Sequence, residues 1–214
     1  GSIRSDLEIM EMAASSLERI SDGAGYRLEL CHIGYFKALM ESLGADEETQ
    51  EEIRRNIEQK NFASLNDLLE QFPNNPAAAA LKYLPRLFGG EEVFEQAYAL
   101  FDDKNARESL DYLRNIYNSL QQLGLGDKVI IDLGLVNQAE YYAGIIFRGY
   151  FDAVGEPVLS GGRYDNLLND FGTDLPAIGF AVNVDLASSI AEKHPPMTAD
   201  VLVMAADDTY LVKT

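Results

Sequence analysis

The chain has 214 residues, 47% of them hydrophobic, which is enough to bury a sizeable core in one or two domains. Its formal charge of −18, from 35 acidic and 17 basic residues, disfavours a nucleic-acid partner, because phosphate contacts need clustered lysine and arginine. We find neither an apolar run of the roughly 18 to 20 residues that a membrane span needs nor a cleavable leader. We therefore expect a soluble, cytoplasmic protein without a membrane partner.

The residue types that usually carry chemistry are sparse and scattered. Cys31 is the single cysteine, and we expect it to be a buried, reduced thiol. His32 and His194 lie far apart, without the spacing of zinc ligands. Adjacent acids such as Asp102 and Asp103 fall on predicted polar faces, where solvated surface is a better interpretation than acid–base chemistry. We expect no metal, no cofactor and no catalytic residue.

The beginning of the chain predicts one helix followed by one strand. Residues 3–20 mix apolar positions with acidic and serine positions, and the acids near their start suit the positive end of a helix dipole. Gly23 and Gly25 end this helix. Residues 26–32 then alternate between apolar and polar side chains, as a strand does.

Residues 35–123 are helical in pattern almost throughout. Gly44 suits a helix C-cap, and Asp46 suits the N-cap of a helix that pairs Glu51 with Arg55 at helical spacing. Pro73 and Pro76 break the pattern. Further helices are predicted over residues 62–72, 77–88, 91–101 and 106–123. The tyrosines of this region are interpreted as a packed face: Tyr98, Tyr112 and Tyr117.

The last third of the chain predicts several strands. Two runs of apolar, aromatic and β-branched residues, 129–136 and 141–150, suit strands, and a turn at 152–157 leads into a short returning strand at 157–160. Gly161 and Gly162 then predict a sharp bend that brings bare backbone close to whatever lies above the sheet. Later elements are predicted as a short helix at 167–171, a strand at 176–184, a helix at 186–193 and a strand at 199–206.

The bend at Gly161 and Gly162 has two interpretations. Flanked by tyrosines and charges, it could bind a carboxylate or an ammonium group through short, directional hydrogen bonds. A tight hairpin with an ordinary aromatic core would show the same residues. Composition alone leaves both open.

Three runs between residues 131 and 185 carry a family resemblance. EYYAGIIF (140–147) resembles the YYTG-type histidine-binding loop of histidyl-tRNA synthetases, and SGGRYD (160–165) resembles their GGRYD loop. PAIGFAVNVD (176–185) occupies the place of motif 3 of class II synthetases, and order and spacing agree as well. The resemblance implies an α+β fold with a partial class II aminoacyl-tRNA synthetase-like antiparallel sheet and a helical insertion.

The resemblance also implies a division of the chain. Residues 1–44 and 124–194 would form the synthetase-like core portion, residues 45–123 the helical insertion, and residues 195–214 the start of a truncated C-terminal segment. Motifs 1 and 2 are not found, so we expect the chain to lack an N-terminal part or to be completed by a partner chain.

The resemblance implies a histidine-like pocket made of the following residues: Glu140, Tyr141, Tyr142, Gly161, Gly162 and Tyr164. If Tyr141 and Tyr142 share one strand, they point to opposite faces. We expect Tyr142 to face the ligand and Tyr141 to pack, with Glu140 near the ammonium or imidazole group. Arg163 is expected to hold the loop through hydrogen bonds to carbonyl groups rather than to touch the ligand.

Two departures from the synthetases indicate a member without their activity. Asn137 stands where the loop RGLDYYTG has an arginine, and Leu186 stands where motif 3 has the arginine that packs on adenine. Neither side chain can replace a fixed cation. This pattern resembles the regulatory subunits of the short-form ATP phosphoribosyltransferase, synthetase-like proteins of histidine biosynthesis that partner a separate catalytic subunit.

The function implied is that of a non-catalytic regulatory subunit that the catalytic subunit needs for activity and for histidine feedback. Self-association into a dimer is expected, and histidine is a candidate ligand. A fragment of a histidyl-tRNA synthetase and a binding domain of another synthetase-like regulator remain as alternatives. Pyrophosphate exchange would favour the synthetase, whereas co-purification with a short phosphoribosyltransferase would favour the regulatory subunit.

Overall fold

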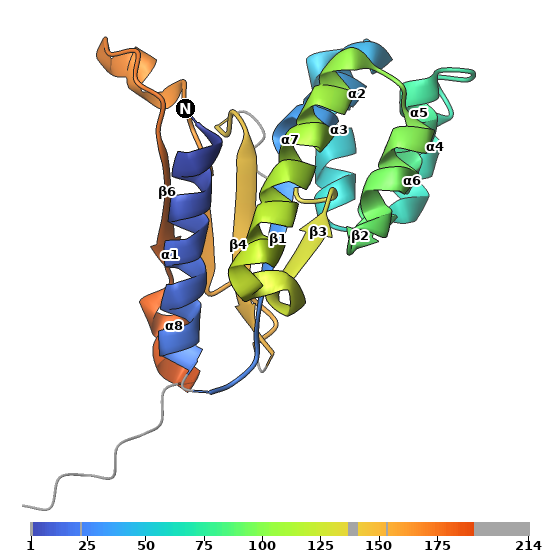
Figure 1. The fold of residues 1–214 in the computed structure, drawn as a ribbon. Helices are drawn as coiled ribbons and strands as arrows, with labels where there is room; N and C mark the ends of the chain where they lie inside the picture. The colour runs from blue at the N-terminus through green and yellow to red at the C-terminus, as the bar shows by residue number, and fades with distance from the viewer. Residues whose placement is uncertain (1, 22, 137–140, 153, 191–214) are drawn as a thin grey trace, which may run out of the picture.

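The computed structural model describes residues 2–21, 23–136, 141–152 and 154–190. In these ranges one sheet has the strand order β2-β3-β1-β4-β5-β6 (Figure 1). The strands are β1 (Tyr26–His32), β2 (Phe88–Gly89), β3 (Val129–Asp132), β4 (Ile145–Phe151), β5 (Leu159–Arg163) and β6 (Ile178–Val182). The helices are α1 (Ile3–Ser21), α2 (Ile33–Leu43), α3 (Glu47–Glu58), α4 (Phe62–Leu69), α5 (Pro76–Tyr83), α6 (Glu92–Leu100), α7 (Lys104–Leu120) and α8 (Val184–Ile190).

The sheet is antiparallel, as predicted, at every strand pair except one. β4 pairs antiparallel with both β1 and β5, β5 with β6, and β2 with β3, whereas β1 and β3 run parallel. Parallel neighbours need a long crossover connection. Helices α2 to α7 provide that connection, since they all lie between β1 and β3 in the chain.

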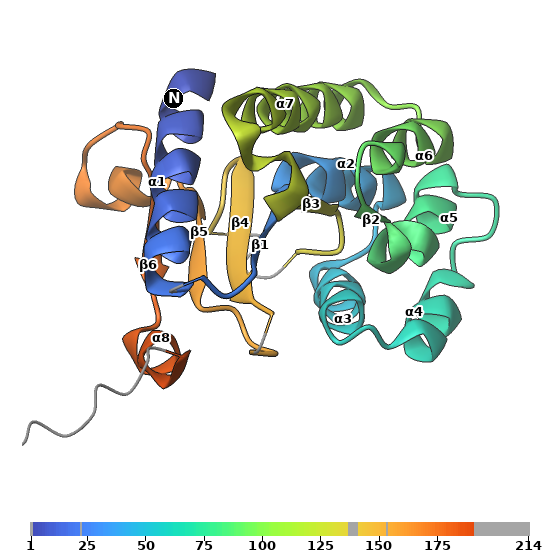
Figure 2. The same ribbon diagram turned by 60° about the horizontal axis from the view of Figure 1, so that its bottom comes forward.

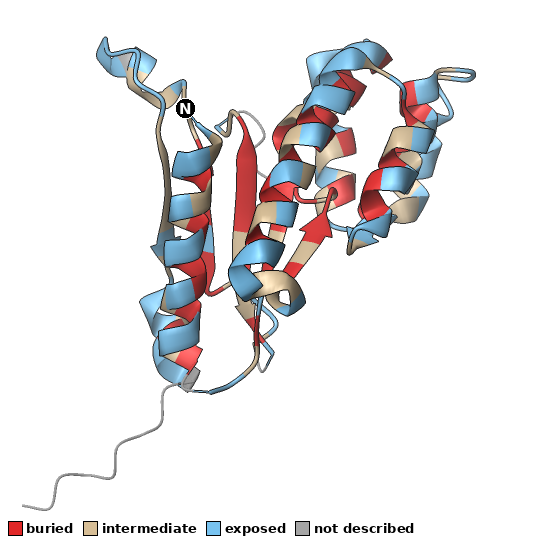
Figure 3. Cartoon of the chain, in the orientation of Figure 1, coloured by how far each residue is buried: buried red, intermediate tan, exposed pale blue. Residues whose placement is uncertain are grey.

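Helices α1 and α7 cover one face of the sheet. The backbone of Gly149 on β4 lies against Leu17 of α1, and the ring of His32 at the end of β1 lies 5.5 Å from that of Tyr112 on α7. Figure 3 shows buried residues on the sides of these helices that meet the strands. Figures 1 and 2 both show α3, α4, α5 and α6 gathered beyond β3 and β2, away from α1.

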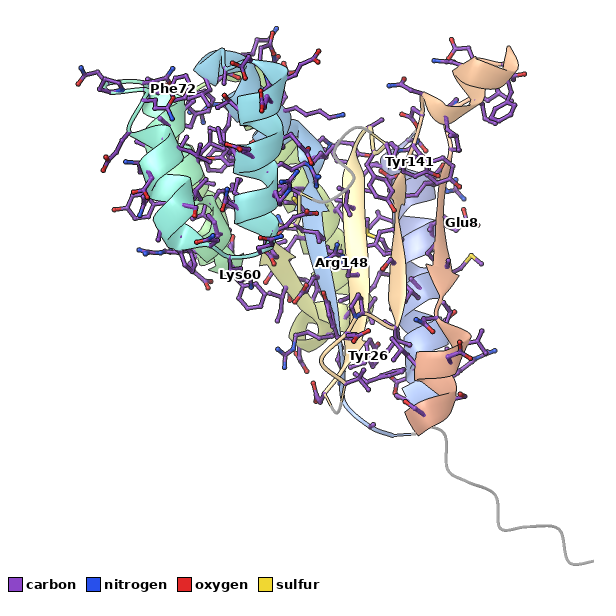
Figure 4. The ribbon with its side chains drawn as sticks, turned by 180° about the vertical axis from the view of Figure 1, so that it is seen from behind. Glu8, Tyr26, Lys60, Phe72, Tyr141 and Arg148 are labelled. Atoms are coloured by element: carbon purple, nitrogen blue, oxygen red, sulfur yellow. The ribbon has the colours of Figure 1, made fainter. Side chains whose placement is uncertain are left out.

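The opposite face of the sheet, which we call the open face, is seen in Figure 4. Among the described residues no helix lies over β4, β5 and β6 on this side. The polar positions of the strands point here, because Arg27 and Glu29 alternate with the buried Leu28 and Leu30 along β1. The open face is therefore where side chains of the sheet can reach a ligand.

Local sequence signals account for most of the helix boundaries. The side chain of Asp46 accepts a hydrogen bond from the backbone N–H of Thr49, 2.8 Å away, as an N-cap does. Gly44 ends α2 with a φ of 69°, in the left-handed region that glycine adopts without strain. Asn75 caps α5, whose first residue is Pro76. The helices predicted around these residues are confirmed.

Some predicted boundaries are wrong. The helix predicted over residues 77–88 ends at Tyr83, since Pro85 lacks an N–H, and Phe88 then joins strand β2. The strand predicted to reach residue 136 ends at Asp132, whose side chain accepts a hydrogen bond from the N–H of Gly134 at 2.8 Å and so starts a turn. The strand predicted at 199–206 lies outside the described residues.

The division into core portion and helical insertion remains a prediction. Buried residues of the sheet, of α1 and of the helices α2 to α7 belong to one continuous hydrophobic cluster. In particular, α2 and α7, which fall on opposite sides of the predicted boundary at residues 44 and 45, pack against each other. Tyr117 of α7 is buried as predicted, while Tyr98 and Tyr112 are partly buried against the cluster.

One buried ion pair ties three distant segments together. The guanidinium group of Arg163 at the end of β5 binds the carboxylate of Asp6 in the first turn of α1, and it also donates to Asp165 at 2.8 Å. The hydroxyl of Tyr112 on α7 donates to the same Asp6 carboxylate at 2.6 Å. Asp6 is fully buried, and Arg163 is 7% exposed. Arg163 was predicted to bind carbonyl groups, so its carboxylate partners are a correction.

The substitution Asp6→Asn tests this ion pair. It leaves the buried guanidinium group of Arg163 with a neutral partner, so it should lower the free energy of unfolding by about 3 to 5 kcal/mol. Asp102→Asn is the matched control, because Asp102 pairs with Arg107 on the surface and such pairs contribute little. Urea unfolding followed by circular dichroism measures both variants. Equal, small effects would contradict the structural importance of the buried pair.

His32 links β1 to α2 in its neutral form. Its Nδ1 accepts a hydrogen bond from the N–H of Gly34 at 3.2 Å and caps α2. Burial lowers the pKa of His32 from 6.5 to about 4, although Asp6 nearby opposes this shift. As the pH falls below 6.5, the unfolded chain binds a proton at this residue that the folded chain does not bind. The stability that neutral His32 contributes is therefore present above pH 6.5 and lost towards pH 4.

The substitution His32→Asn should remove this pH dependence while keeping an N-cap acceptor. Between pH 7 and pH 5 the unaltered chain should lose about 1 to 2 kcal/mol more stability than the variant. Urea titrations at the two pH values give this difference. If both proteins lose the same stability between the two pH values, His32 takes up its proton as readily in the folded chain as in the unfolded chain.

Candidate functional site

Tyr141 and Tyr142 lie in a turn that precedes β4, not on the strand predicted at 141–150. The strand begins only at Ile145, because the backbone before it bonds elsewhere. The N–H of Ala143 donates to the carbonyl of Arg163 at 2.7 Å, and the carbonyl of Gly144 accepts from the N–H of Ile33 at 3.0 Å. The alternation argument for the two tyrosines therefore does not apply, and both can lie on one side of the chain.

Gly161 and Gly162 lie within β5, so the sharp bend predicted here is wrong. The strand runs to Arg163, with Gly161 opposite Phe147 and Gly162 opposite Ile146. Close approach, not a turn, explains these glycines. A Cβ atom at Gly161 would lie 2.5 Å from the carbonyl oxygen of Gly179 and 2.6 Å from the Phe147 ring, and one at Gly162 would lie 2.6 Å from the Tyr142 ring.

The three tyrosines of the predicted pocket form one cluster. The rings of Tyr141 and Tyr142 are 5.0 Å apart and meet edge to face, and those of Tyr141 and Tyr164 are 5.5 Å apart and stacked. Tyr142 lies over Gly162, and the Tyr164 hydroxyl lies 3.0 Å from the Cβ position of Gly179. These glycines are paired neighbours on β5 and β6, so Tyr142 and Tyr164 lie over adjacent bare positions of the sheet.

The cluster lies on the open face. Successive residues of a strand point to opposite faces, and the Cβ position of Gly161 faces the core residues Phe147 and Phe180. Gly162, with the Tyr142 ring over it, must face the other way. Figure 4, drawn from the open face, shows Tyr141 beyond the end of β4.

The cluster offers aromatic surface together with phenol hydroxyl groups. Tyr141 is 42% exposed, while Tyr142 and Tyr164 are partly buried. Burial raises the pKa of Tyr142, and the neighbouring Tyr141 and Tyr164 raise it further, so its hydroxyl stays protonated and able to donate. Such a site can stack a planar ring and hydrogen-bond its polar atoms.

Lys37 on α2 adds a cation that sequence reasoning missed. Its ammonium group donates to the carbonyl oxygen of Tyr142 at 2.8 Å. Nothing in the helical pattern of residues 35–44 distinguishes this lysine from a solvated one. Only the position of α2 beside the turn before β4 brings it to the tyrosines.

The remaining residues of the sequence prediction divide into two groups. Glu140 and Asn137 lie outside the described residues. Leu186 lies in the first turn of α8, where its N–H donates to the side-chain oxygen of Asn183 at 3.2 Å and its side chain packs against the hydrophobic cluster. Cys31 is buried as predicted, and burial raises the pKa of its thiol.

Comparison with known proteins identifies the family. A family model for histidyl-tRNA synthetase matches residues 1–186. The chain belongs to this family. Within the histidyl-tRNA synthetase family, the relatives of this chain include an ATP phosphoribosyltransferase regulatory subunit from Clostridium botulinum, 39% identical over 202 residues. That match covers 92% of this chain and 47% of the relative, so the chain spans about half the length of the curated relatives it matches.

Solved structures agree with this assignment. The fold is similar to that of an ATP phosphoribosyltransferase regulatory subunit/histidyl-tRNA synthetase from Bacillus halodurans, with a TM-score of 0.81 and 29% identity over 91% of this chain and 51% of the other. It is also similar to a chain of an ATP phosphoribosyl transferase complex from Thermotoga maritima, with a TM-score of 0.61 and 21% identity over 77% and 57% of the two chains. The second likeness shows the fold alone.

These comparisons confirm the resemblance to the regulatory subunits and the α+β, class II synthetase-like fold. The ligand roles of the pocket residues stay predictions. In the described part of the chain no group of three or more histidine, cysteine, aspartate or glutamate side chains could hold a metal ion. None of the described helices combines the length and apolar character of a membrane span.

The substitution Gly162→Ala tests the close contact under Tyr142. The added methyl group would also meet the carbonyl oxygen of Ile145 at 2.7 Å, so backbone as well as ring must shift. We expect the free energy of unfolding to fall by about 1 to 3 kcal/mol. Gly155→Ala is the matched control, because nothing lies within 4 Å of its Cβ position. Equal losses of stability in the two variants, measured by urea unfolding, would contradict the observed packing.

Proposed function

We propose that this chain acts as a non-catalytic regulatory subunit of the short-form ATP phosphoribosyltransferase. The observation that carries the proposal is the curated relative of that name, 39% identical over 92% of this chain. In this role the protein is required for the activity of a separate catalytic subunit and for feedback by histidine. A regulatory subunit needs a catalytic partner, so the name of this relative supports a hetero-oligomeric assembly.

The pocket of this subunit is proposed to hold histidine on the open face. Tyr142 and Tyr164 lie over the paired glycines 162 and 179, whose missing side chains let the two tyrosines lie close to the backbone. Tyr141 stacks on Tyr164 and covers the site. Imidazole is planar and both donates and accepts hydrogen bonds, so it suits a group of phenol rings and their hydroxyls. Glu140 is proposed to bind the ammonium group of the ligand.

Loss of synthetase activity is part of the same proposal. The positions of the two family arginines hold Asn137 and Leu186 in this sequence. The packing of Leu186 against the hydrophobic cluster supports this, because an apolar side chain held there offers no charge to a nucleotide. A cytoplasmic location, self-association into a dimer and the absence of a nucleic-acid partner complete the proposal.

Feedback by histidine is a coupling between two binding equilibria. Histidine must bind the regulatory subunit with different affinity in the active and the inhibited assembly. The tyrosine cluster lies beside α2, because Lys37 binds the turn that holds Tyr142. Movement of this turn could therefore be transmitted to α2 and to α7, which packs against it.

The proposal is tested by assaying a short-form catalytic subunit with and without this protein in its full natural length. We expect activation, and we expect added histidine to reverse it. The matched variants are Tyr164→Ala in the cluster and Tyr83→Ala, which removes an exposed tyrosine on α5. Loss of a polar anchor should weaken the histidine effect by about 1 to 3 kcal/mol in the first variant only.

Two outcomes would contradict the proposal. If the protein does not activate the catalytic subunit but catalyses pyrophosphate exchange in the presence of histidine and ATP, it is a histidyl-tRNA synthetase instead. Activation with a histidine response that is equal in both tyrosine variants would keep the regulatory role and remove Tyr164 from the histidine site.

A further inference from the structure

A second polar site lies on the open face, between the end of α3 and the strands β1, β3 and β4. A cavity of about 360 Å³ is found there. Its lining includes five charged side chains: Glu29, Glu58, Lys60, Asp132 and Arg148. None of the three tyrosines of the candidate site lines it. We call it the charged cavity.

The fold brings the charges of this cavity together from distant segments. Glu29 on β1 and Arg148 on β4 are direct partners in the antiparallel register, so their side chains share the open face. Asp132 ends β3, the other neighbour of β1. Lys60 follows α3 in the left-handed region, with a φ of 52°. Figure 4 shows Arg148 on the sheet and Lys60 at the end of α3 beside it.

Four of these five charges have no direct ion-pair partner. Glu58 binds Arg54 at 2.9 Å and is thereby neutralised within α3. By contrast, among the described residues no lysine or arginine nitrogen lies within 4 Å of a carboxylate oxygen of Glu29 or Asp132. Lys60 and Arg148 line the same cavity without contacting the two carboxylates: the Lys60 ammonium lies 6.0 Å from the centre of the Phe88 ring, and Arg148 interacts with the Tyr150 hydroxyl.

Burial makes the two unpaired carboxylates costly. Asp132 is 9% exposed, and its carboxylate accepts a hydrogen bond from the N–H of Gly134. Burial raises the pKa of both Glu29 and Asp132, and the charge of Asp132 raises the pKa of Glu29 further. Lys60 and Arg148 act in the opposite direction and lower the pKa of both carboxyl groups. Buried charges are normally paired or bound to a ligand. A ligand of complementary charge would supply the missing partners.

The balance of charges indicates the chemistry of that ligand. Two carboxylates and two cations stand unpaired, so a molecule with one positive and one negative group can satisfy both kinds. A simple anion such as phosphate would be repelled by the two carboxylates, and a divalent cation would be repelled by Lys60 and Arg148. We propose that the charged cavity binds a free α-amino acid, its ammonium group towards Glu29 and Asp132 and its carboxylate towards Arg148 and Lys60.

The size and the surroundings of the cavity fit this class of ligand. Its volume of about 360 Å³ accommodates a single amino acid but not a folded peptide. Tyr150 lies in the same lining, and its hydroxyl is hydrogen-bonded towards Glu29, which lowers the pKa of that carboxyl against the effect of burial. The three tyrosines of the cluster do not line this cavity, although Arg148 is close enough to lower the pKa of Tyr142, and the proposal does not depend on the function proposed for the cluster.

Isothermal titration calorimetry of the whole chain with each of the twenty standard L-amino acids tests the proposal directly. Inorganic phosphate and Mg²⁺ are titrated in parallel. We expect at least one amino acid to bind with a dissociation constant below about 1 mM, and we expect neither ion to bind. No catalytic subunit is present, so the result is independent of the activation assay described above.

Matched variants place the binding in the cavity. Arg148→Gln and Lys60→Gln should each weaken it at least about tenfold, the loss expected when a charge-assisted hydrogen bond is removed. Arg27→Gln is the control on the same face of β1, outside the cavity, and Tyr164→Ala is the control for the tyrosine cluster. An amino acid that binds in the cavity should bind both controls as it binds the unaltered chain, whereas histidine held at the tyrosine cluster would be weakened by Tyr164→Ala and not by Lys60→Gln. Lys60 is exposed, so its substitution reports on binding even where Arg148→Gln unfolds the chain.

Three results would overturn the proposal. The first is that no amino acid binds at concentrations up to about 10 mM. The second is that binding is unchanged in Lys60→Gln and abolished in Tyr164→Ala, which would move the ligand to the tyrosine cluster. The third is that phosphate or Mg²⁺ binds in place of an amino acid, which would make the cavity an ion site.

Discussion

The buried carboxylate of Asp6 is the constraint on which much of this structure depends. A charge without exposure to water costs several kcal/mol unless it is paired and hydrogen-bonded. Asp6 obtains its partners from Arg163, 157 residues away in the sequence, and from Tyr112, 106 residues away. Burial alone would lower the pKa of Arg163, but Asp6 and Asp165 raise it, so the guanidinium group stays charged. The first turn of α1, the end of β5 and α7 are thereby fixed together.

This constraint sets the geometry of the candidate site. Arg163 points to the covered face of the sheet, where it meets Asp6, so its neighbours in the chain are turned towards the open face. Gly162 and Tyr164 are those neighbours. The carbonyl of Arg163 also accepts from the N–H of Ala143, which holds the turn carrying Tyr141 and Tyr142 against the end of β5. One buried pair thus positions the cluster without touching it.

The open face carries two kinds of surface in one sheet. At the end of β5, glycines leave the strand backbones without side chains, and tyrosine rings pack directly over them. This aromatic surface suits a planar ligand. Along β1 and β4 the same face is charged, with Glu29 opposite Arg148. Both proposals place small polar ligands on this face of a histidyl-tRNA synthetase-like sheet, while its other face packs against the core.

The family, the α+β class and most of the helices could be predicted from the sequence alone, because motifs, caps and apolar periodicity are local. Asp46, Gly44 and Pro76 mark helix ends through contacts with residues a few positions away. Through the resemblance to a known loop pair the sequence also predicted that Tyr141, Tyr142, Gly162 and Tyr164 lie together, as they do in the structure, whereas Gly161 faces the core. It placed them wrongly in detail, since Gly161 and Gly162 lie inside a strand and Tyr141 and Tyr142 outside one.

The folded structure was needed to explain why those glycines are required, which carboxylates Arg163 binds, and how Lys37, Lys60 and Arg148 reach the open face. Each of these features depends on segments that are far apart in the chain and meet only after the sheet has formed. Local patterns report the conformation that a residue favours, whereas burial and charge pairing depend on the neighbours that folding supplies.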